Sequence, residues 1–351
     1  MQYPNGMTVA YAYDARGRLT DIHCRDAANV TLERYTYTFD GADNITQVVD
    51  AATAKWAYAY DDRYRLTQAE RYLGAALKHR YTYTYDGADN AATQAVYNAS
   101  AGTTNSIAYT YNAGNELTQA VSSANGTTSY AYDLWGRLTG ITRGSQSAAL
   151  GWAYQDRLKS YTTTLTGERS VNFAYTGDGR RMGVDNTLFG AKSWSYDGAW
   201  GVRTQGYASL PDYSRWYIQE PWGTVLAEAP VSGVVSDLRY YVRDHLGSTR
   251  SVRREDTTKF AWLEYDPYGT TYASGGWIGF VQDRFTGHEF DMETNMYWAP
   301  YRYYRPDMLR WASRDPLGMI DGPNIYGYVH GMPLNQVDLH GTLSLPDFMT
   351  V

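Results

Sequence analysis

The sequence has one cysteine and no long hydrophobic run. Cys24 alone can form neither an internal disulfide nor a cysteine-based zinc site. No apolar stretch approaches the ~18 residues that a membrane helix needs, so the sequence predicts no membrane span. The first residues lack the charged end and the apolar stretch of a signal peptide, so we expect none.

The sequence also lacks long stretches of charge of one sign and the common catalytic motifs. Acidic and basic residues are mixed along the chain, the formal net charge is −6, and no basic stripe indicates a nucleic-acid partner. No serine lies in a G-x-S-x-G elbow, and His288-Glu289 lacks the spacing of a zinc protease. We therefore expect neither a turnover enzyme nor a cofactor.

Tyrosine, by contrast, is abundant, with 35 residues against 8 phenylalanines. A chain with 15% aromatic residues is a poor candidate for disorder, because disordered segments have few aromatics. Tyrosine favours strands and combines an apolar ring with a polar tip. The composition therefore favours a thin β-shell with one partly hydrated face over a densely packed β-sandwich.

Internal repeats run through the first half of the sequence. RYTYTFDGADN at 34–44 returns at 80–90 with Tyr for Phe, and AYAYDARGRLT at 10–20 returns in related form at 57–67 and 129–139. In each unit alternating residues form a strand, an Asp-centred segment turns the chain, and a second strand follows. One hairpin cannot bury its own face, so we expect neighbouring hairpins to pack side by side in an all-β fold.

These units resemble the YD repeats of Rhs proteins, toxin-complex C subunits and teneurins, and residues 130–139 are a close copy. Residues 240–250, 265–269 and 285–318 resemble the Rhs core-associated segment in order and content. The resemblance implies a spiral of antiparallel β-hairpins that forms a shell, or part of one, closed by a C-terminal plug. It divides the chain into a repeat shell (1–237), a core-associated segment (238–341) and a remnant tail (342–351).

The same family carries a self-cleavage signal of two D-P-x-G-L elements separated by eighteen residues. Here the elements are 315–319 and 338–342, and residues 320–337 lie between them. The resemblance implies a catalytic pair, Asp315 and Asp338, assisted by Arg314, which cuts between Thr342 and Leu343. Two adjacent carboxylates can share a proton, so that one activates water while the other polarises the carbonyl.

An ordinary turn is the alternative for both elements. Asp-Pro-x-Gly at 315–318 suits a type I turn, and Asp338 can make a local turn of its own. The elements also depart from the family pattern, because Met319 and Thr342 replace leucine and Leu339 replaces the second proline.

By resemblance, the shell would enclose a C-terminal toxin polypeptide as its partner and would be secreted or delivered by a bacterial secretion system. Components of that system, or of a toxin complex, are further expected partners. A different hypothesis is a YD-repeat module that binds glycans or another protein without catalysis, because strand-borne Tyr and Trp can stack on sugars. Cross-strand packing of these rings is the structural alternative.

Overall fold

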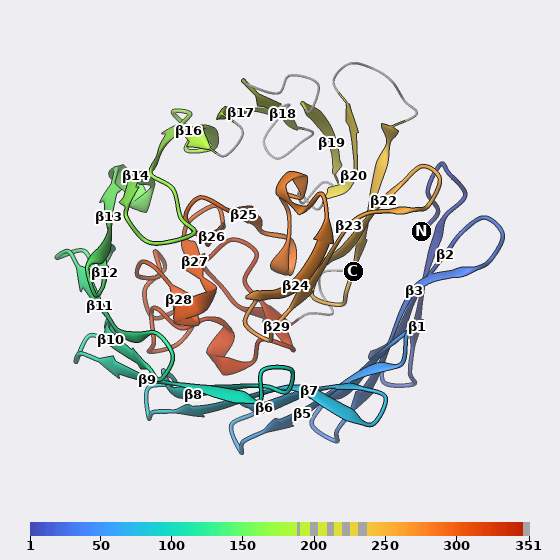
Figure 1. The fold of residues 1–351 in the computed structure, drawn as a ribbon, viewed down its shortest axis with the longest axis horizontal. Coiled ribbons are helices and arrows are strands. Elements are labelled where there is room, and N and C mark those ends of the chain that lie inside the picture. Colours follow the sequence, from blue (N-terminus) through green and yellow to red (C-terminus); the bar gives the residue numbers. More distant parts are fainter. Residues whose placement is uncertain (188–189, 197–202, 209–213, 220–224, 231–236, 347–351) are drawn as a thin grey trace.

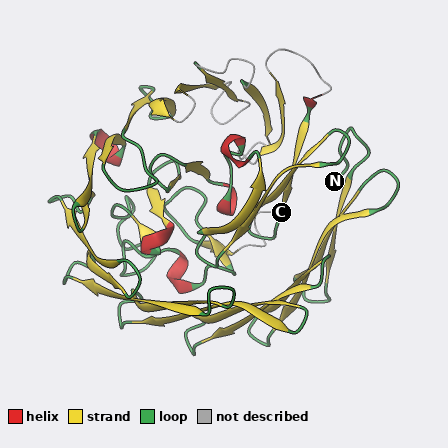
Figure 2. Cartoon of the chain, in the orientation of Figure 1, coloured by secondary structure: helices red, strands yellow, loops and turns green. Residues whose placement is uncertain are grey.

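A computed structural model describes residues 1–187, 190–196, 203–208, 214–219, 225–230 and 237–346. Within these ranges the chain forms β-strands and short 3-10 turns, without an α-helix (Figure 2). The all-β fold predicted from the repeats is confirmed. None of the helical turns in the described ranges has the length and hydrophobicity that a membrane crossing requires.

Within the described ranges, one antiparallel sheet of 24 strands forms the wall, and each of these strands pairs with the next along the chain. The first twelve are β1 (Thr8–Tyr13), β2 (Leu19–Arg25), β3 (Thr31–Phe39), β4 (Ile45–Asp50), β5 (Ala54–Tyr60), β6 (Leu66–Leu73), β7 (Ala76–Tyr85), β8 (Ala91–Asn98), β9 (Thr103–Tyr111), β10 (Leu117–Ser122), β11 (Gly126–Tyr132) and β12 (Leu138–Arg143). The rest are β13 (Gln146–Trp152), β14 (Leu158–Thr163), β15 (Val171–Tyr175), β16 (Arg181–Thr187), β17 (Gly190–Tyr196), β18 (Arg203–Tyr207), β19 (Arg215–Gln219), β20 (Val225–Pro230), β21 (Arg239–Arg243), β22 (Thr249–Arg254), β23 (Lys259–Tyr265) and β24 (Thr271–Gly276).

Smaller elements fill the region inside the wall (Figure 1). They form a four-stranded sheet and a two-stranded sheet: β25 (Glu289–Asp291), β26 (Met296–Trp298), β27 (Tyr303–Arg305), β28 (Arg310–Trp311), and β29 (Gln336–Val337) with β30 (Leu345–Pro346). The 3-10 turns are η1 (Tyr154–Asp156) in the wall, and η4 (Ile278–Phe280), η5 (Phe285–Gly287), η6 (Pro306–Met308) and η7 (Val329–Gly331) further along the chain.

The repeated aspartate closes each hairpin. At Asp86 one carboxylate oxygen accepts hydrogen bonds from the backbone N–H groups of Ala88 and Asn90, both at 2.9 Å. The strand register also shifts at Tyr85, just before this turn, and equivalent shifts occur at Phe39 and Tyr60. Such irregularities bend a strand and increase its twist, so their repetition gives the wall its curvature.

The wall coils into a spiral, because its last strands lie inside its first strands (Figure 1). Tyr3 donates through its hydroxyl to the Tyr241 carbonyl at 3.0 Å, and Arg253 pairs with Glu33 at 2.9 Å. Tyr85 on β7 and Tyr268 after β23 join their hydroxyls at 2.7 Å. The spiral arrangement expected from the family resemblance is confirmed.

The wall continues past residue 237, the last residue of the predicted repeat shell. Strands β21–β24, which lie in the core-associated segment 238–341, continue the wall as far as Gly276.

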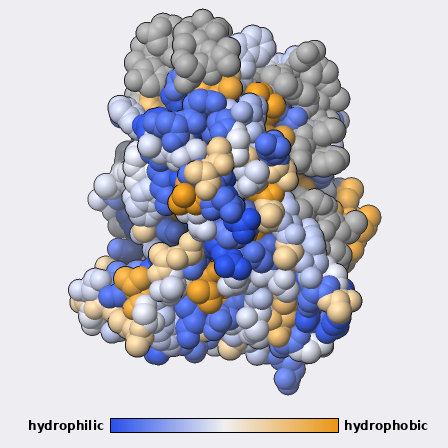
Figure 3. Space-filling model, turned by 90° about the vertical axis from the view of Figure 1, so that its right-hand side faces the viewer, coloured by the Kyte–Doolittle hydropathy of each residue, from blue (hydrophilic) through white to orange (hydrophobic). Residues whose placement is uncertain are grey.

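The inner face of the wall is less exposed to solvent than we expected from the tyrosine composition. Tyr83 on β7 is 2% exposed, and its ring centre lies 5.1 Å from that of Tyr268 after β23. Tyr161 on β14 is 0% exposed, and its hydroxyl accepts a hydrogen bond from Arg305 of the interior. Polar and apolar residues are intermixed on the outer face seen in Figure 3.

Buried ion pairs join the wall to the interior. Arg181 on β16 lies 2.6 Å from Asp291 and 3.0 Å from Glu289, both on β25, and the three side chains are at most 2% exposed. Removing one partner of a buried pair leaves an uncompensated charge. We expect Arg181→Ala to lower the free energy of unfolding by about 3–5 kcal/mol, measured by chemical denaturation.

The matched control is Arg16→Ala, because Arg16 pairs with Asp43 where both side chains are about half exposed. We expect this substitution to cost at most about 1 kcal/mol. Equal losses for the two variants would contradict the role of Arg181 in joining β16 to β25.

Candidate functional site

Three segments of the interior bring the candidate site together. Arg302 comes directly before β27, Asp315 follows β28, and Asp338 follows β29. Asp315 does form the turn that its sequence favours, since its Oδ1 accepts the Leu317 N–H at 2.7 Å and its carbonyl accepts the Gly318 N–H at 3.0 Å. The turn therefore positions the carboxylate and does not compete with a role in chemistry.

A single guanidinium nitrogen links the two aspartates. Arg302 Nη2 lies 2.7 Å from Asp315 Oδ2 and 2.9 Å from Asp338 Oδ2. The side chains of all three residues are at most 3% exposed. The guanidinium also lies over the ring of Trp311, with its carbon 4.4 Å from the ring centre. The two sequence-predicted aspartates are thus held on one cation.

Burial sets the charge of this cluster. Burial raises the pKa of Asp315, and this effect exceeds the lowering influence of Arg302. Burial likewise lowers the pKa of Arg302, against the opposing influence of Asp338 and Asp315. One arginine and two carboxylates are neutral together when one carboxyl keeps its proton, and a buried site favours that state.

Asp338 also binds the backbone that follows it. Its Oδ1 accepts N–H groups from Gly341 and Thr342 at 2.8 Å each and from Leu343 at 3.2 Å. The last of these is the nitrogen of the Thr342–Leu343 bond, where the sequence predicts the cut. A carboxylate is well suited to three converging N–H donors.

Gly341 makes this close approach possible. Its φ is +75°, and a Cβ there would lie 3.0 Å from Arg302 Cβ. Its carbonyl also accepts a hydrogen bond from Arg302 Nε at 2.5 Å. The second element therefore wraps around the arginine that holds both carboxylates.

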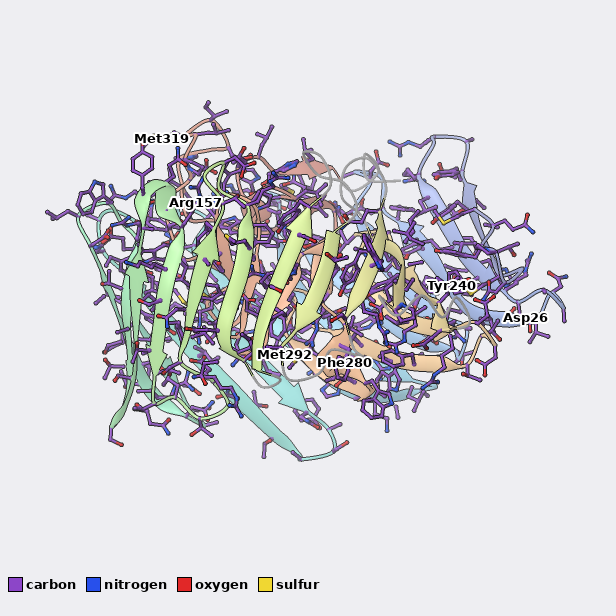
Figure 4. All side chains as sticks on the ribbon, turned by 90° about the horizontal axis from the view of Figure 1, so that it is seen from above. Asp26, Arg157, Tyr240, Phe280, Met292 and Met319 are labelled. Carbon is purple, nitrogen blue, oxygen red and sulfur yellow. The ribbon has the colours of Figure 1, made fainter. Side chains whose placement is uncertain are left out.

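The expected bond lies near solvent although the carboxylates are buried. Leu343 is 41% exposed, while the Asp338 side chain is 1% exposed. The loop after Asp315 reaches one rim of the wall, where Figure 4 labels Met319 together with Arg157. The residue on the downstream side of the expected bond is thus exposed to solvent.

The structure does not place Arg314 at the carboxylates. Its Nη2 lies 3.2 Å from Glu116, and its Nε donates to the Tyr326 hydroxyl at 3.2 Å, both away from Asp338. Arg302 occupies the position that the sequence assigned to Arg314, and sequence reasoning missed it. Its only signal was its place in the Arg302-Tyr303-Tyr304 stretch of the family resemblance.

His288 lies behind Asp338. Its Nδ1 is 2.7 Å from the Thr286 hydroxyl, and burial lowers its pKa despite the nearby Asp338 charge. A neutral histidine adds no further cation to the cluster. Among the described residues, no group of three or more His, Cys, Asp or Glu is placed to hold a metal ion.

Comparisons with known proteins agree with this architecture. The RHS repeat family model matches residues 111–148. The double-stranded DNA deaminase toxin A of Burkholderia cenocepacia is 27% identical over 240 residues, covering 60% of this chain and 17% of that toxin. The toxin subunit YenC2 of Yersinia entomophaga is 33% identical over 118 residues, covering 32% of this chain and 12% of that subunit.

A crystal structure of TcdB2–TccC3 superposes on 97% of this chain with a TM-score of 0.76 and 22% identity, and the match covers 19% of that chain. At this identity the likeness establishes the fold alone. The chain thus spans less than a fifth of the length of each of these three relatives. The repeats, the 24-stranded spiral and these matches agree, and the chain resembles proteins of the Rhs/YD-repeat family, whose repeat model it matches over residues 111–148.

Proposed function

We propose that this chain is part of a β-shell that encloses a toxin polypeptide and separates it by a single cut between Thr342 and Leu343. The observation that carries the proposal is the convergence at Asp338. One of its oxygens contacts the nitrogen of that bond, and the other shares Arg302 with Asp315. An aspartate that only capped a turn would need neither the contact with the nitrogen of that bond nor the shared arginine.

The cut is a hydrolysis and consumes one water. Asp338 removes a proton from the water, whose oxygen bonds to the Thr342 carbonyl carbon, while the protonated Asp315 polarises the carbonyl oxygen. The carbon–nitrogen bond then breaks as Asp338 passes its proton to the Leu343 nitrogen. The products are a carboxylate on Thr342 and an ammonium on Leu343.

Arg302 has an electrostatic role in this scheme. It holds both carboxylates in place, and its charge opposes the negative charge that develops on the carbonyl oxygen. Its position is set by Trp311 and the Gly341 carbonyl before any reaction begins. Preorganised charge of this kind needs no rearrangement during the reaction.

Enclosure is supported by the direction of the chain at the cut. The segment after Leu343 pairs with β29, which lies inside the ring of wall strands (Figure 1). A polypeptide that continued from it would therefore start within the spiral. Likeness to toxin subunits supports a toxin as the enclosed partner and delivery by a secretion system or toxin complex.

Intact mass of the purified protein tests the cut. We expect a chain that ends at Thr342, and we expect Asp315→Asn and Asp338→Asn to restore full length. Asp256→Asn is the matched control, because Asp256 also caps a turn, at the Thr258 N–H, but is exposed. A full-length wild-type chain, or a cut Asp338→Asn chain, would contradict the proposal.

Arginine variants separate the two candidate cations. We expect Arg302→Lys to slow the cut by about 10²-fold, because a lysine cannot contact both carboxylates while also donating to the Gly341 carbonyl and lying flat over the Trp311 ring. Arg314→Gln should change the rate by no more than about twofold, since Arg314 contacts Glu116 at the exposed rim. Cleavage is followed as a time course of intact mass. If Arg314→Gln slowed the cut more than Arg302→Lys, Arg314 and not Arg302 would be the cation that assists it.

The pH dependence follows from Asp315. Burial raises its pKa, and the scheme needs its protonated form, which is present below that pKa and is lost above it. We expect the cut to slow as the pH rises through the pKa of Asp315. A time course of cleavage in freshly refolded protein across pH 4–9 measures this, and a rate that increases steadily with pH would rule out Asp315 as the acid.

A further inference from the structure

The residues after the expected cut are held by defined contacts. Ser344 donates to Asp321 Oδ2 twice, through its N–H at 3.1 Å and through its hydroxyl at 2.7 Å. Leu345 then pairs with Val337 in the two-stranded sheet of β29 and β30. Leu343 donates its N–H to Asp338, so the three consecutive residues 343–345 are each held by a different part of the interior.

Asp321 is itself held in place from β29. His330 Nε2 is 2.5 Å from the Asp321 carbonyl and 3.7 Å from its carboxylate, and His330 Nδ1 is 3.2 Å from Gln336 on β29. Burial works to lower the pKa of His330, but these oxygen partners outweigh it and leave the pKa raised. A histidine with a proton on each ring nitrogen can donate through both of them, which ties the Asp321 loop to the strand.

From this geometry we infer a peptide-binding site for the segment that follows the cut. The site consists of Asp338, Asp321 and β29, and its ligand is an extended peptide with a hydroxyl-bearing second residue. Its use as a product site rests on the proposed cleavage. Asp321 supplies the selectivity, because an alanine in place of Ser344 would keep the backbone donor and lose the hydroxyl donor.

The cut would strengthen this site. Hydrolysis turns the Leu343 N–H into an ammonium, whose nitrogen starts 3.2 Å from Asp338 Oδ1. A hydrogen bond between two charged groups is roughly twice as strong as a neutral one. The fragment therefore gains an ion pair at the moment when its covalent link is lost, and it stays on the shell.

The same contacts act before the cut. They hold Leu343 in register, so that its nitrogen meets Asp338, and they keep the downstream chain extended. Asp321 is therefore a positioning residue for the cleavage as well as a ligand-binding residue. It lies in the 320–337 interval between the two aspartate elements, and its negative charge adds to burial in raising the pKa of Asp315.

The first experiment uses the cut protein and the synthetic peptide LSLPDFMTV, which is residues 343–351. Native mass spectrometry should show the released peptide still bound, and exchange against labelled peptide gives its dissociation rate. We expect Ser344→Ala and Asp321→Asn to raise this rate by about tenfold, and Ser344→Thr to leave it near the wild-type value. An N-acetylated peptide should bind about tenfold more weakly than the free amine.

A second experiment does not depend on cleavage. In an Asp315→Asn background the chain is expected to stay whole, and hydrogen exchange reports the amides of Leu343, Ser344 and Leu345. We expect these amides to be protected, to lose protection with Ser344→Ala or Asp321→Asn, and to keep it with Ser344→Thr.

The two experiments separate the two proposals. If the wild-type chain is never cut, the proposed function fails, and hydrogen exchange alone decides the binding site. If the chain is cut but the fragment leaves at the same rate from wild type, Ser344→Ala and Asp321→Asn, the binding site is wrong and the cleavage proposal stands. Unchanged exchange of the three amides in both variants would likewise overturn the site.

Discussion

The inner face of the wall has to be covered, and the covering of that face is the constraint on which the rest of the molecule depends. A row of antiparallel hairpins has one apolar face and no second sheet of its own to bury it. Here the chain's own interior segment supplies the cover. Tyrosine suits this contact because its ring is buried while its hydroxyl still finds a partner, as in the 2.8 Å contact between Tyr175 and Tyr303.

Cations make the second kind of connection between wall and interior. Arg181 reaches from β16 to Asp291, and Arg305 reaches back from β27 to Glu168 at 2.7 Å. Such pairs contribute little net free energy when they are buried, but each is costly to break. They therefore specify how the interior sits within the spiral more than they add to its stability.

The candidate site is a consequence of the same packing. Asp315 and Asp338 begin two separate turns, and neither turn alone would bring its carboxylate to the other. Arg302 is placed by its neighbour Tyr303, whose ring is buried against Phe173 and Trp152 of the wall. The wall thus holds the three side chains together and keeps bulk water from screening the interactions between them.

Several features follow from the sequence alone because their causes lie between near neighbours. Alternation of tyrosine with small residues defines the strands, the Asp-centred turns close the hairpins, and the repetition of this unit defines the all-β wall. The pairing of the elements at Asp315 and Asp338 was implied by the family resemblance, to which their spacing conforms. All of this information lies within stretches of a few tens of residues.

Tertiary structure decided the rest, because it depends on which distant segments pack together. It continued the wall to Gly276, buried the tyrosine face, and put Arg302 at the carboxylates in place of Arg314. It also brought Ser344 to Asp321, a contact that no motif predicts. A side chain's partners are set by the path of the whole chain, and in a spiral that path is defined only when the last strands close inside the first.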